Sequence, residues 1–137
     1  MTDTDTSLRA LLQHTHTIAV VGLSPKPQRP SHGVAQYLQA HGYRVIPVNP
    51  GHETILGETS YPDLRSIPEP VDMVDVFRRP DQVAAVVEDA VAIGAPSLWL
   101  QLGVIDEAAA QRARDAGLTV VMDRCLKIEH ARLIGDG

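Results

Sequence analysis

Short apolar segments alternate along this chain with longer amphipathic ones, and this alternation restricts the fold more strongly than any other feature. The apolar segments have the length of β-strands and lie at residues 17–22, 43–48, 71–77, 97–102 and 118–122. Apolar residues at helical spacing lie at residues 7–14, 31–41, 80–93, 106–117 and 126–133. Strands that alternate with helices of this length form βαβ units around a parallel sheet. The sequence therefore predicts a doubly wound α/β fold, with a mostly parallel five-stranded sheet and helices on both faces.

Individual residues mark where several of the predicted elements begin. Ser31 is of a type favoured at the N-cap, so we expect it to cap the helix over residues 31–41. Pro80 is favoured in the first turn of a helix and opens the next one. Acidic and apolar residues alternate between residues 71 and 77, which predicts a strand with only one face covered.

Size and charge exclude several classes of protein. The 137 residues favour one domain over residues 1–137, with a core at about residues 10–133. The net charge of −5 argues against nucleic acid as a partner, because such binding depends on a basic surface. No apolar run approaches the ~20 residues of a membrane span, and the N-terminus does not resemble a secretory signal. The single cysteine, Cys125, excludes an internal disulfide and fits a reducing compartment, so we expect a cytoplasmic protein without a membrane partner.

Residues 18–33 have the order strand, tight turn, polar loop and helix. The apolar run ends at Gly22, and the loop that follows carries Lys26 and Arg29 among three prolines. Such an arrangement directs backbone N–H groups and the positive end of a helix dipole at the loop, which is the geometry that binds phosphate. The segment therefore predicts a phosphate-bearing, nucleotide-like ligand.

Positive charge is concentrated in the segments that directly follow the predicted strands. Six of the twelve Lys and Arg residues fall there: Lys26, Arg29, Arg78, Arg79, Arg124 and Lys127. Because the carboxyl ends of parallel strands meet at one edge of the sheet, these cations would raise the positive potential where such folds bind ligands. A small molecule with several phosphates is the simple inference. The alternative is that these residues are scattered surface charges.

The loop after the first strand differs from the usual dinucleotide-binding fingerprint. Ser24 and Pro27 stand where that fingerprint needs glycines, and Asn49-Pro50 stands where an acidic residue would bind the ribose of NAD. An ordinary NAD site is therefore disfavoured.

Five motifs in this order resemble the small stand-alone CoA-binding domain proteins, a family related to the N-terminal domain of succinyl-CoA synthetase α subunits and to ADP-forming acyl-CoA synthetases. The resemblance covers roughly residues 10–133. The motifs are Val-Val-Gly-Leu-Ser-Pro-Lys-Pro-Gln-Arg-Pro-Ser-His (20–32), Val-Ile-Pro-Val-Asn-Pro (45–50), Val-Asp-Met-Val-Asp-Val-Phe-Arg-Arg-Pro (71–80), Leu-Trp-Leu-Gln-Leu-Gly-Val (98–104) and Met-Asp-Arg-Cys-Leu-Lys-Ile-Glu (122–129).

The resemblance implies a Rossmann-like fold with coenzyme A bound along the carboxyl ends of the strands. The phosphates would be bound by residues of the first motif: Gly22, Ser24, Lys26, Arg29 and Ser31. The nucleotide would be lined by residues of the second and third motifs: Asn49, Pro50, Phe77, Arg78 and Pro80. The pantetheine arm would pass residues of the fourth motif: Gln101, Gly103 and Val104.

The function that this resemblance implies is non-catalytic binding of CoA or acyl-CoA, by a carrier or a sensor. The related ligases need a phosphorylatable histidine on a further domain and a nucleotide-binding module, so we do not expect ligase chemistry from these 137 residues. The residues show no catalytic constellation, because adjacent residues such as Ser31 and His32 point apart at a helix start. The alternative is an NAD(P)-binding regulator or a small acyl-CoA-dependent enzyme that uses the same pocket.

Cys125 is the residue that would add redox chemistry to such a site. One hypothesis is a mixed disulfide with bound CoA, since neighbouring cations favour a reactive thiolate. The other is a small buried residue that caps the sheet, as free cysteines often do. The intact mass after treatment with diamide and CoA distinguishes them. The histidines have no metal-ligand spacing beyond His14-x-His16, so we expect no metal.

Overall fold

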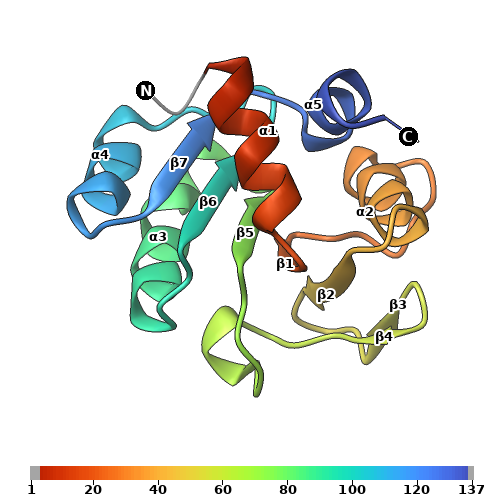
Figure 1. The fold of residues 1–137 in the computed structure, drawn as a ribbon. Coiled ribbons are helices and arrows are strands. Elements are labelled where there is room, and N and C mark those ends of the chain that lie inside the picture. Colours follow the sequence, from red (N-terminus) through yellow and green to blue (C-terminus); the bar gives the residue numbers. More distant parts are fainter. Residues whose placement is uncertain (1–3, 136–137) are drawn as a thin grey trace.

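The computed structural model describes residues 4–135, which are built around a parallel sheet of five strands (Figure 1). The strands are β1 (Thr17–Val21), β2 (Arg44–Val48), β5 (Met73–Val76), β6 (Ser97–Leu100) and β7 (Thr119–Met122). They lie in the order β2-β1-β5-β6-β7, and each neighbouring pair is parallel. The chain winds outward in opposite directions from β1 and β5, so the switch point of the sheet lies between these two strands. The predicted α/β fold is confirmed.

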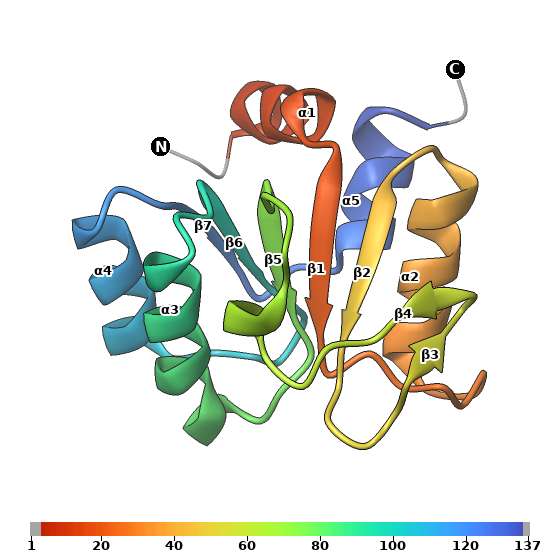
Figure 2. The same cartoon turned by 90° about the horizontal axis from the view of Figure 1, so that it is seen from below.

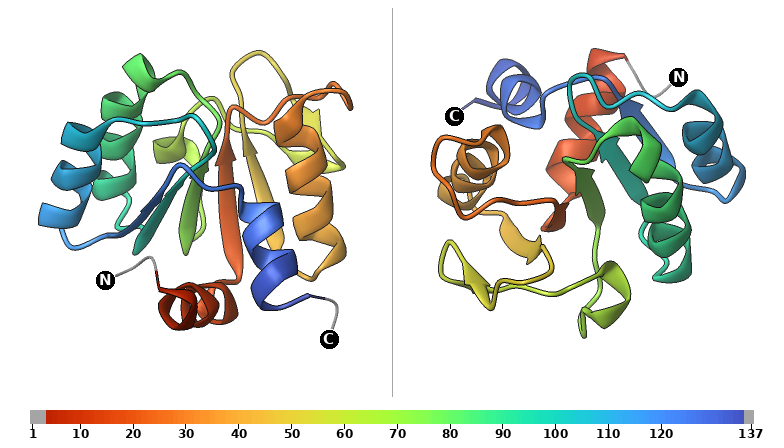
Figure 3. Two further views of the ribbon diagram at one scale, coloured as in Figure 1. Left: turned by 90° about the horizontal axis from the view of Figure 1, so that it is seen from above. Right: turned by 180° about the vertical axis from the view of Figure 1, so that it is seen from behind.

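Helices cover both faces of this sheet (Figures 2 and 3). The α-helices are α1 (Asp5–His14), α2 (Pro30–Ala40), α3 (Val83–Ala92), α4 (Glu107–Asp115) and α5 (Leu126–Leu133). α3 and α4 pack on one face, α2 and α5 on the other, and α1 lies across the amino ends of the strands. Short 3-10 turns, η1 (Leu64–Ser66) and η2 (Pro80–Gln82), lie in the connections before and after β5. None of the helices within residues 4–135 is long and apolar enough to cross a membrane.

Alternate side chains of the strands build two apolar cores, one on each face of the sheet. Ile18 and Val20 of β1 contribute to the core beneath α2 and α5, whereas Ala19 and Val21 contribute to the core beneath α3 and α4. The central strands are buried on both faces, as is expected where helices flank a parallel sheet.

A small antiparallel hairpin was not predicted from the sequence. It consists of β3 (Thr54–Ile55) and β4 (Glu58–Thr59), joined by Leu56 and Gly57. Both joining residues have positive φ, of 53° and 77°, which tight hairpin turns require. A leucine rarely adopts this conformation, so the usual turn signal is missing from the sequence. After the hairpin the chain returns to the end of β2, where Tyr61 forms a bridge with Val48.

Two local predictions were wrong. The N-cap of α2 is Arg29, which has an extended backbone, and not Ser31. The helix begins earlier because Pro30 is already fixed near helical φ and needs no N–H at the first helical position. Strand β5 is covered on both faces and not on one, so its acidic residue, Asp75, lies inside the protein.

Asp75 is fully buried at the centre of the sheet, between Val20 of β1 and Trp99 of β6. The amide Nε2 of Gln101 donates a hydrogen bond to its Oδ1 at 2.7 Å, while Oδ2 has no hydrogen-bond partner within residues 4–135. Burial raises the pKa of Asp75 to about 7, and the hydrogen bond from Gln101 opposes this rise only in part. The carboxyl group therefore keeps its proton in the folded protein under mildly acidic conditions.

Because Asp75 is buried, we expect the free energy of unfolding to fall as the pH rises from about 4 to 7. In that range Asp75 is ionised in the unfolded chain but protonated in the folded one, so folding binds a proton. The contribution of Asp75 to the free energy of unfolding therefore falls by about 1.4 kcal/mol per pH unit and levels off above pH 7. Denaturant unfolding across this range should show a shallower slope for Asp75→Asn, whereas Asp81→Asn, at an exposed site, should keep the wild-type slope. Equal slopes for all three proteins would contradict this account.

Candidate functional site

The candidate site lies at the switch point, where β1 and β5 end side by side. Phe77, directly after β5, donates its backbone N–H to the carbonyl of Val21 at 2.8 Å. Gly22, directly after β1, has a φ of +85°, and a Cβ added there would lie 2.1 Å from the carbonyl oxygen of Phe77. Both the conformation and the space at this position therefore require glycine. The contact lies at the switch point of the sheet, and ligands of doubly wound folds bind in the crevice outside the carboxyl ends of the strands at such a point.

Hydroxyl groups fold the loop between β1 and α2. The Oγ of Ser31 accepts a hydrogen bond from the backbone N–H of Ser24 at 3.0 Å, and the Oγ of Ser24 accepts one from the backbone N–H of Lys26 at 3.1 Å. The backbone N–H of Arg29 closes a turn onto the carbonyl of Lys26. Ser31 is buried and joins the first turn of α2 to the start of the loop. These bonds position the backbone of the loop and leave its charged side chains at the surface.

A second loop, residues 49–53, is held against the first by Asn49. Its amide Nδ2 donates to the carbonyl of Leu23 at 2.8 Å, and its backbone N–H donates to the carbonyl of Tyr61 at 2.9 Å. Ser60 donates its Oγ–H to the carbonyl of Asn49 and its backbone N–H to that of Glu53. The side chain of Asn49 thus fixes the distance between the two loops.

A cavity of about 470 Å³, open to solvent, lies between these two loops and the segment after β5. Its lining residues are Gly22, Ser24, Pro25, Lys26, Arg29, Pro30, Ser31, Asn49, His52, Phe77 and Arg78. Three of them are cations and none is an acid, so the potential inside is positive. The amino end of α2 adds the positive end of its dipole. A cavity of this kind favours an anion with several charged groups.

The sequence predicted much of this lining. The cavity brings together eight of the predicted binding residues: Gly22, Ser24, Lys26, Arg29, Ser31, Asn49, Phe77 and Arg78. Pro50 and Pro80 are exposed and lie outside the lining. Sequence reasoning missed Pro25, Pro30 and His52. The two prolines lie inside the first motif and were treated only as loop residues, whereas His52 lies two residues beyond the second motif, so continuing that motif would have found it.

Gln101, Gly103 and Val104 also lie outside this cavity, in the loop after β6. Gln101 is buried against Asp75, and its carbonyl accepts a hydrogen bond from the N–H of Val104 at 2.9 Å. Gly103 donates its N–H to Oδ1 of Asp123 at 2.8 Å, which ties this loop to the end of β7. Through these hydrogen bonds all three residues hold the loop after β6 in place.

The six cations at the carboxyl edge divide into two groups. Lys26, Arg29 and Arg78 line the cavity. The other three have partners elsewhere: Arg79 lies 3.6 Å from Asp81, Arg124 lies 2.6 Å from Glu129, and Lys127 lies over the ring of Tyr37. The lining cations thus differ from the other three in having no ion-pair partner within residues 4–135.

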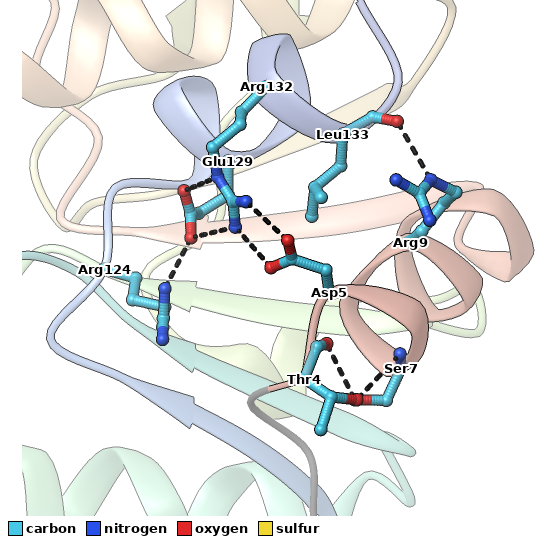
Figure 4. Close-up of polar contacts among 8 residues, drawn as sticks. All are labelled: Thr4, Asp5, Ser7, Arg9, Arg124, Glu129, Arg132 and Leu133. Atoms are coloured by element: carbon cyan, nitrogen blue, oxygen red, sulfur yellow. Dashed lines mark hydrogen bonds and ion pairs between the residues drawn. The ribbon is translucent and has the colours of Figure 1, made fainter.

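Glu129 is the centre of an ion-pair network that joins α5 to α1 (Figure 4). It accepts hydrogen bonds from Arg124 and Arg132, and Arg132 also forms two bonds of 2.9 Å with Asp5. The hydrogen bond from Arg132 is the main cause that lowers the pKa of Glu129, with a further contribution from Arg124. Glu129 therefore stays ionised and retains Arg124 beside it.

Cys125 lies at the N-cap of α5, next to this network. It is half-buried, packs against the apolar core and is not among the residues that line the cavity. The packing agrees with a structural role, and the mixed disulfide with CoA stays a prediction.

Comparison with known proteins adds independent information. The sequence profile described as CoA binding domain matches residues 16–131. Uncharacterized protein YneT of Bacillus subtilis (strain 168) is 43% identical over 124 residues, which cover 90% of this chain and 92% of that protein. A hypothetical protein from Pyrococcus horikoshii OT3 has a similar structure, with a TM-score of 0.94, 42% identity and coverage of 96% of this chain and 93% of the other. The structure of cell-free ID.343 from Thermus thermophilus gives a TM-score of 0.92 at 41% identity, covering 96% and 99%.

Gly22 is in close contact with Phe77, whereas Gly33 has open space around it, so we expect alanine to have opposite effects at these two positions. Gly22→Ala places a methyl group on the Phe77 carbonyl at a strained φ and should lower the free energy of unfolding by about 2 kcal/mol or more. Gly33, inside α2, has open space where an added Cβ would lie, so Gly33→Ala should raise it by roughly 0.5–1 kcal/mol. Denaturant unfolding of the two variants measures both values. A Gly22→Ala protein as stable as wild type would show that the two strand ends are free to separate.

Proposed function

Because this chain belongs to the CoA-binding domain family, we propose that it binds coenzyme A, free or acylated, in the cavity at the switch point of its sheet. The observation that carries the proposal is the lining itself, with three cations and no carboxylate among the described residues. Coenzyme A contains a pyrophosphate and a separate 3′-phosphate. A ligand with anionic groups at two places suits a cavity with cations on two sides, in the β1–α2 loop and after β5.

The same lining argues against NAD as the ligand of the alternative, an NAD(P)-binding regulator. An NAD site uses an acidic residue at the end of the second strand to bind the ribose hydroxyl groups. Here Asn49 occupies that place, and its amide is bonded to the backbone of the phosphate loop. A carboxylate at this position would also repel the phosphates of CoA.

Binding without catalysis is the activity that these residues support best. The hydroxyl groups of Ser24 and Ser31 both accept hydrogen bonds from backbone N–H groups of the loop. No carboxylate and no thiol lines the cavity in the described part of the chain, and the two serine hydroxyl groups are paired with loop N–H groups and not with His52, the histidine of the lining. We infer that the protein stores, delivers or senses CoA, and that a small acyl-CoA-dependent enzyme is the less favoured role.

A ligand panel tests the proposal directly. Titration calorimetry should give saturable binding of CoA, weaker binding of dephospho-CoA and much weaker binding of NAD and NADP, because only CoA carries both a pantetheine arm and the 3′-phosphate on its nucleotide. Native mass spectrometry of the purified protein would show whether CoA or an acyl-CoA remains bound. Affinity for NAD equal to that for CoA would reject the proposal in favour of the regulator.

Substitutions of Arg78 and of its neighbour Arg79 test whether CoA binding depends on the cations that line the cavity. Arg78→Ala removes a cation from the lining and should weaken CoA binding by about 10- to 100-fold, as expected for loss of a charged hydrogen bond. Arg79→Ala changes a neighbouring exposed arginine that faces Asp81 and should leave the affinity within about twofold. Comparing CoA with dephospho-CoA then assigns the phosphate: a loss restricted to CoA places Arg78 at the 3′-phosphate, and an equal loss places it at the pyrophosphate. Equal effects of the two substitutions would contradict binding in this cavity.

A further inference from the structure

Two large apolar side chains are exposed on the loop between β6 and α4. Leu102 is 60% exposed and Ile105 is 45% exposed, and within residues 4–135 the only other large hydrophobic residue exposed to this degree is Ile128 of α5. Single exposed apolar residues are common on protein surfaces and need no explanation. Two of them on one short loop, at the edge of the sheet that carries the cavity, indicate a surface that contacts an apolar group.

The backbone of this loop is fixed on both sides of Leu102. The N–H of Val104 donates to the carbonyl of Gln101 and closes a tight turn, in which Gly103, with a φ of +80°, has the third position, where type II turns need glycine. The side chains of Gln101 and Val104 are buried. The N–H of Gly103 is bonded to Asp123 at the end of β7 over 2.8 Å. The turn therefore holds Leu102 at its tip, and little conformational entropy is lost when a ligand packs against it.

The loop lies directly beside the wall of the cavity. Its first residue, Gln101, donates its backbone N–H to the carbonyl of Val76 at 3.4 Å, and the residue after Val76 is Phe77, which lines the cavity. In the sheet, β6 is the neighbour of β5 on the side away from β1. A ligand that extends from the cavity along the carboxyl edge past Phe77 therefore reaches Leu102 and Ile105 next.

The cavity and the loop differ in chemistry in the same way as the two ends of an acyl-CoA. The cavity is lined by three cations and suits phosphates. Residues 101–105 of the loop carry no charge. In an acyl-CoA the phosphates lie at one end of the molecule, and the pantetheine arm carries the acyl group at the other end. The arm allows the phosphates to lie in the cavity while the acyl chain lies outside it.

We propose that Leu102 and Ile105 form the surface on which the protein binds the acyl chain of an acyl-CoA, so that its ligand is the CoA thioester of an apolar acid. The inference rests on the proposed binding of CoA in the cavity and names the class of acyl group. A fully buried CH₂ group corresponds to about fourfold in affinity. Because the loop covers a chain from one side only, each CH₂ group that lies on it should add about twofold.

Titration calorimetry with CoA, acetyl-CoA and octanoyl-CoA tests this inference. The wild-type protein should bind octanoyl-CoA, which has six more CH₂ groups than acetyl-CoA, about 10- to 60-fold more tightly than acetyl-CoA. The double variant Leu102→Ser/Ile105→Ser should bind the two thioesters with affinities within about threefold of each other. Its affinity for CoA should stay within about twofold of wild type, because both side chains are exposed and lie outside the cavity lining.

Ile128→Ser is the matched control, because Ile128 is also exposed, at 57%, but lies on α5 and not on the loop. This variant should keep the wild-type preference for octanoyl-CoA. A wild-type protein without this preference, or a preference that survives in the double variant, would overturn the inference while leaving CoA binding intact. Absence of binding of CoA and of both thioesters would reject the proposed function itself.

A second copy of this chain is the competing occupant of the loop. Sedimentation of the ligand-free wild-type protein should show a monomer, because the proposed occupant is the acyl chain of the ligand. A dimer that dissociates in the double variant but persists in Ile128→Ser would place the loop in an interface between copies, and it would overturn the inference.

Discussion

The contact between the ends of β1 and β5 is the constraint on which the cavity depends. Gly22 lets the backbone after β1 pass against the carbonyl of Phe77, a distance that a side chain at this position would not allow. This contact places the loop between β1 and α2 beside the segment that carries Arg78. Residues that lie more than fifty positions apart in the chain thereby line one cavity. Without this contact, the loop between β1 and α2 would contribute only its own cations, Lys26 and Arg29, to a cavity.

The polar residues of the cavity form two groups: neutral side chains that hold the loops in place, and cations that carry the charge of the lining. Ser24, Ser31 and Asn49 use their side chains in hydrogen bonds that fold and join the two loops. The cations of the lining, Lys26, Arg29 and Arg78, form no ion pair within residues 4–135. Since the loops are fixed by neutral groups, the charged groups stay available to a ligand. Preorganised loops of this kind lose little conformational entropy on binding.

The sequence predicted the sheet and most of the lining because both depend on local patterns. Apolar runs separated by helical spacing are sufficient to identify parallel strands, and the carboxyl ends of those strands then identify the edge that carries the polar residues. The hairpin at residues 54–59 depends on Leu56 at positive φ, which no local preference predicts. The burial of Asp75 and the pairing of Arg124 with Glu129 were equally out of reach, because each depends on tertiary neighbours. Alternation of acids in a strand does not reveal whether a helix covers both of its faces.

The net charge of an acidic protein is a poor guide to the ligand that it binds. Acidic residues of α3 form ion pairs with arginines: Glu88 pairs with Arg112, and Asp89 pairs with Arg65. At physiological ionic strength, interactions between exposed charges are screened over about 8 Å. An anion in the cavity therefore interacts mainly with the three cations that line it, and only weakly with the distant acids that determine the net charge. At this edge Arg79 and Arg124 have acidic partners, whereas the described acids leave the lining cations without a carboxylate partner.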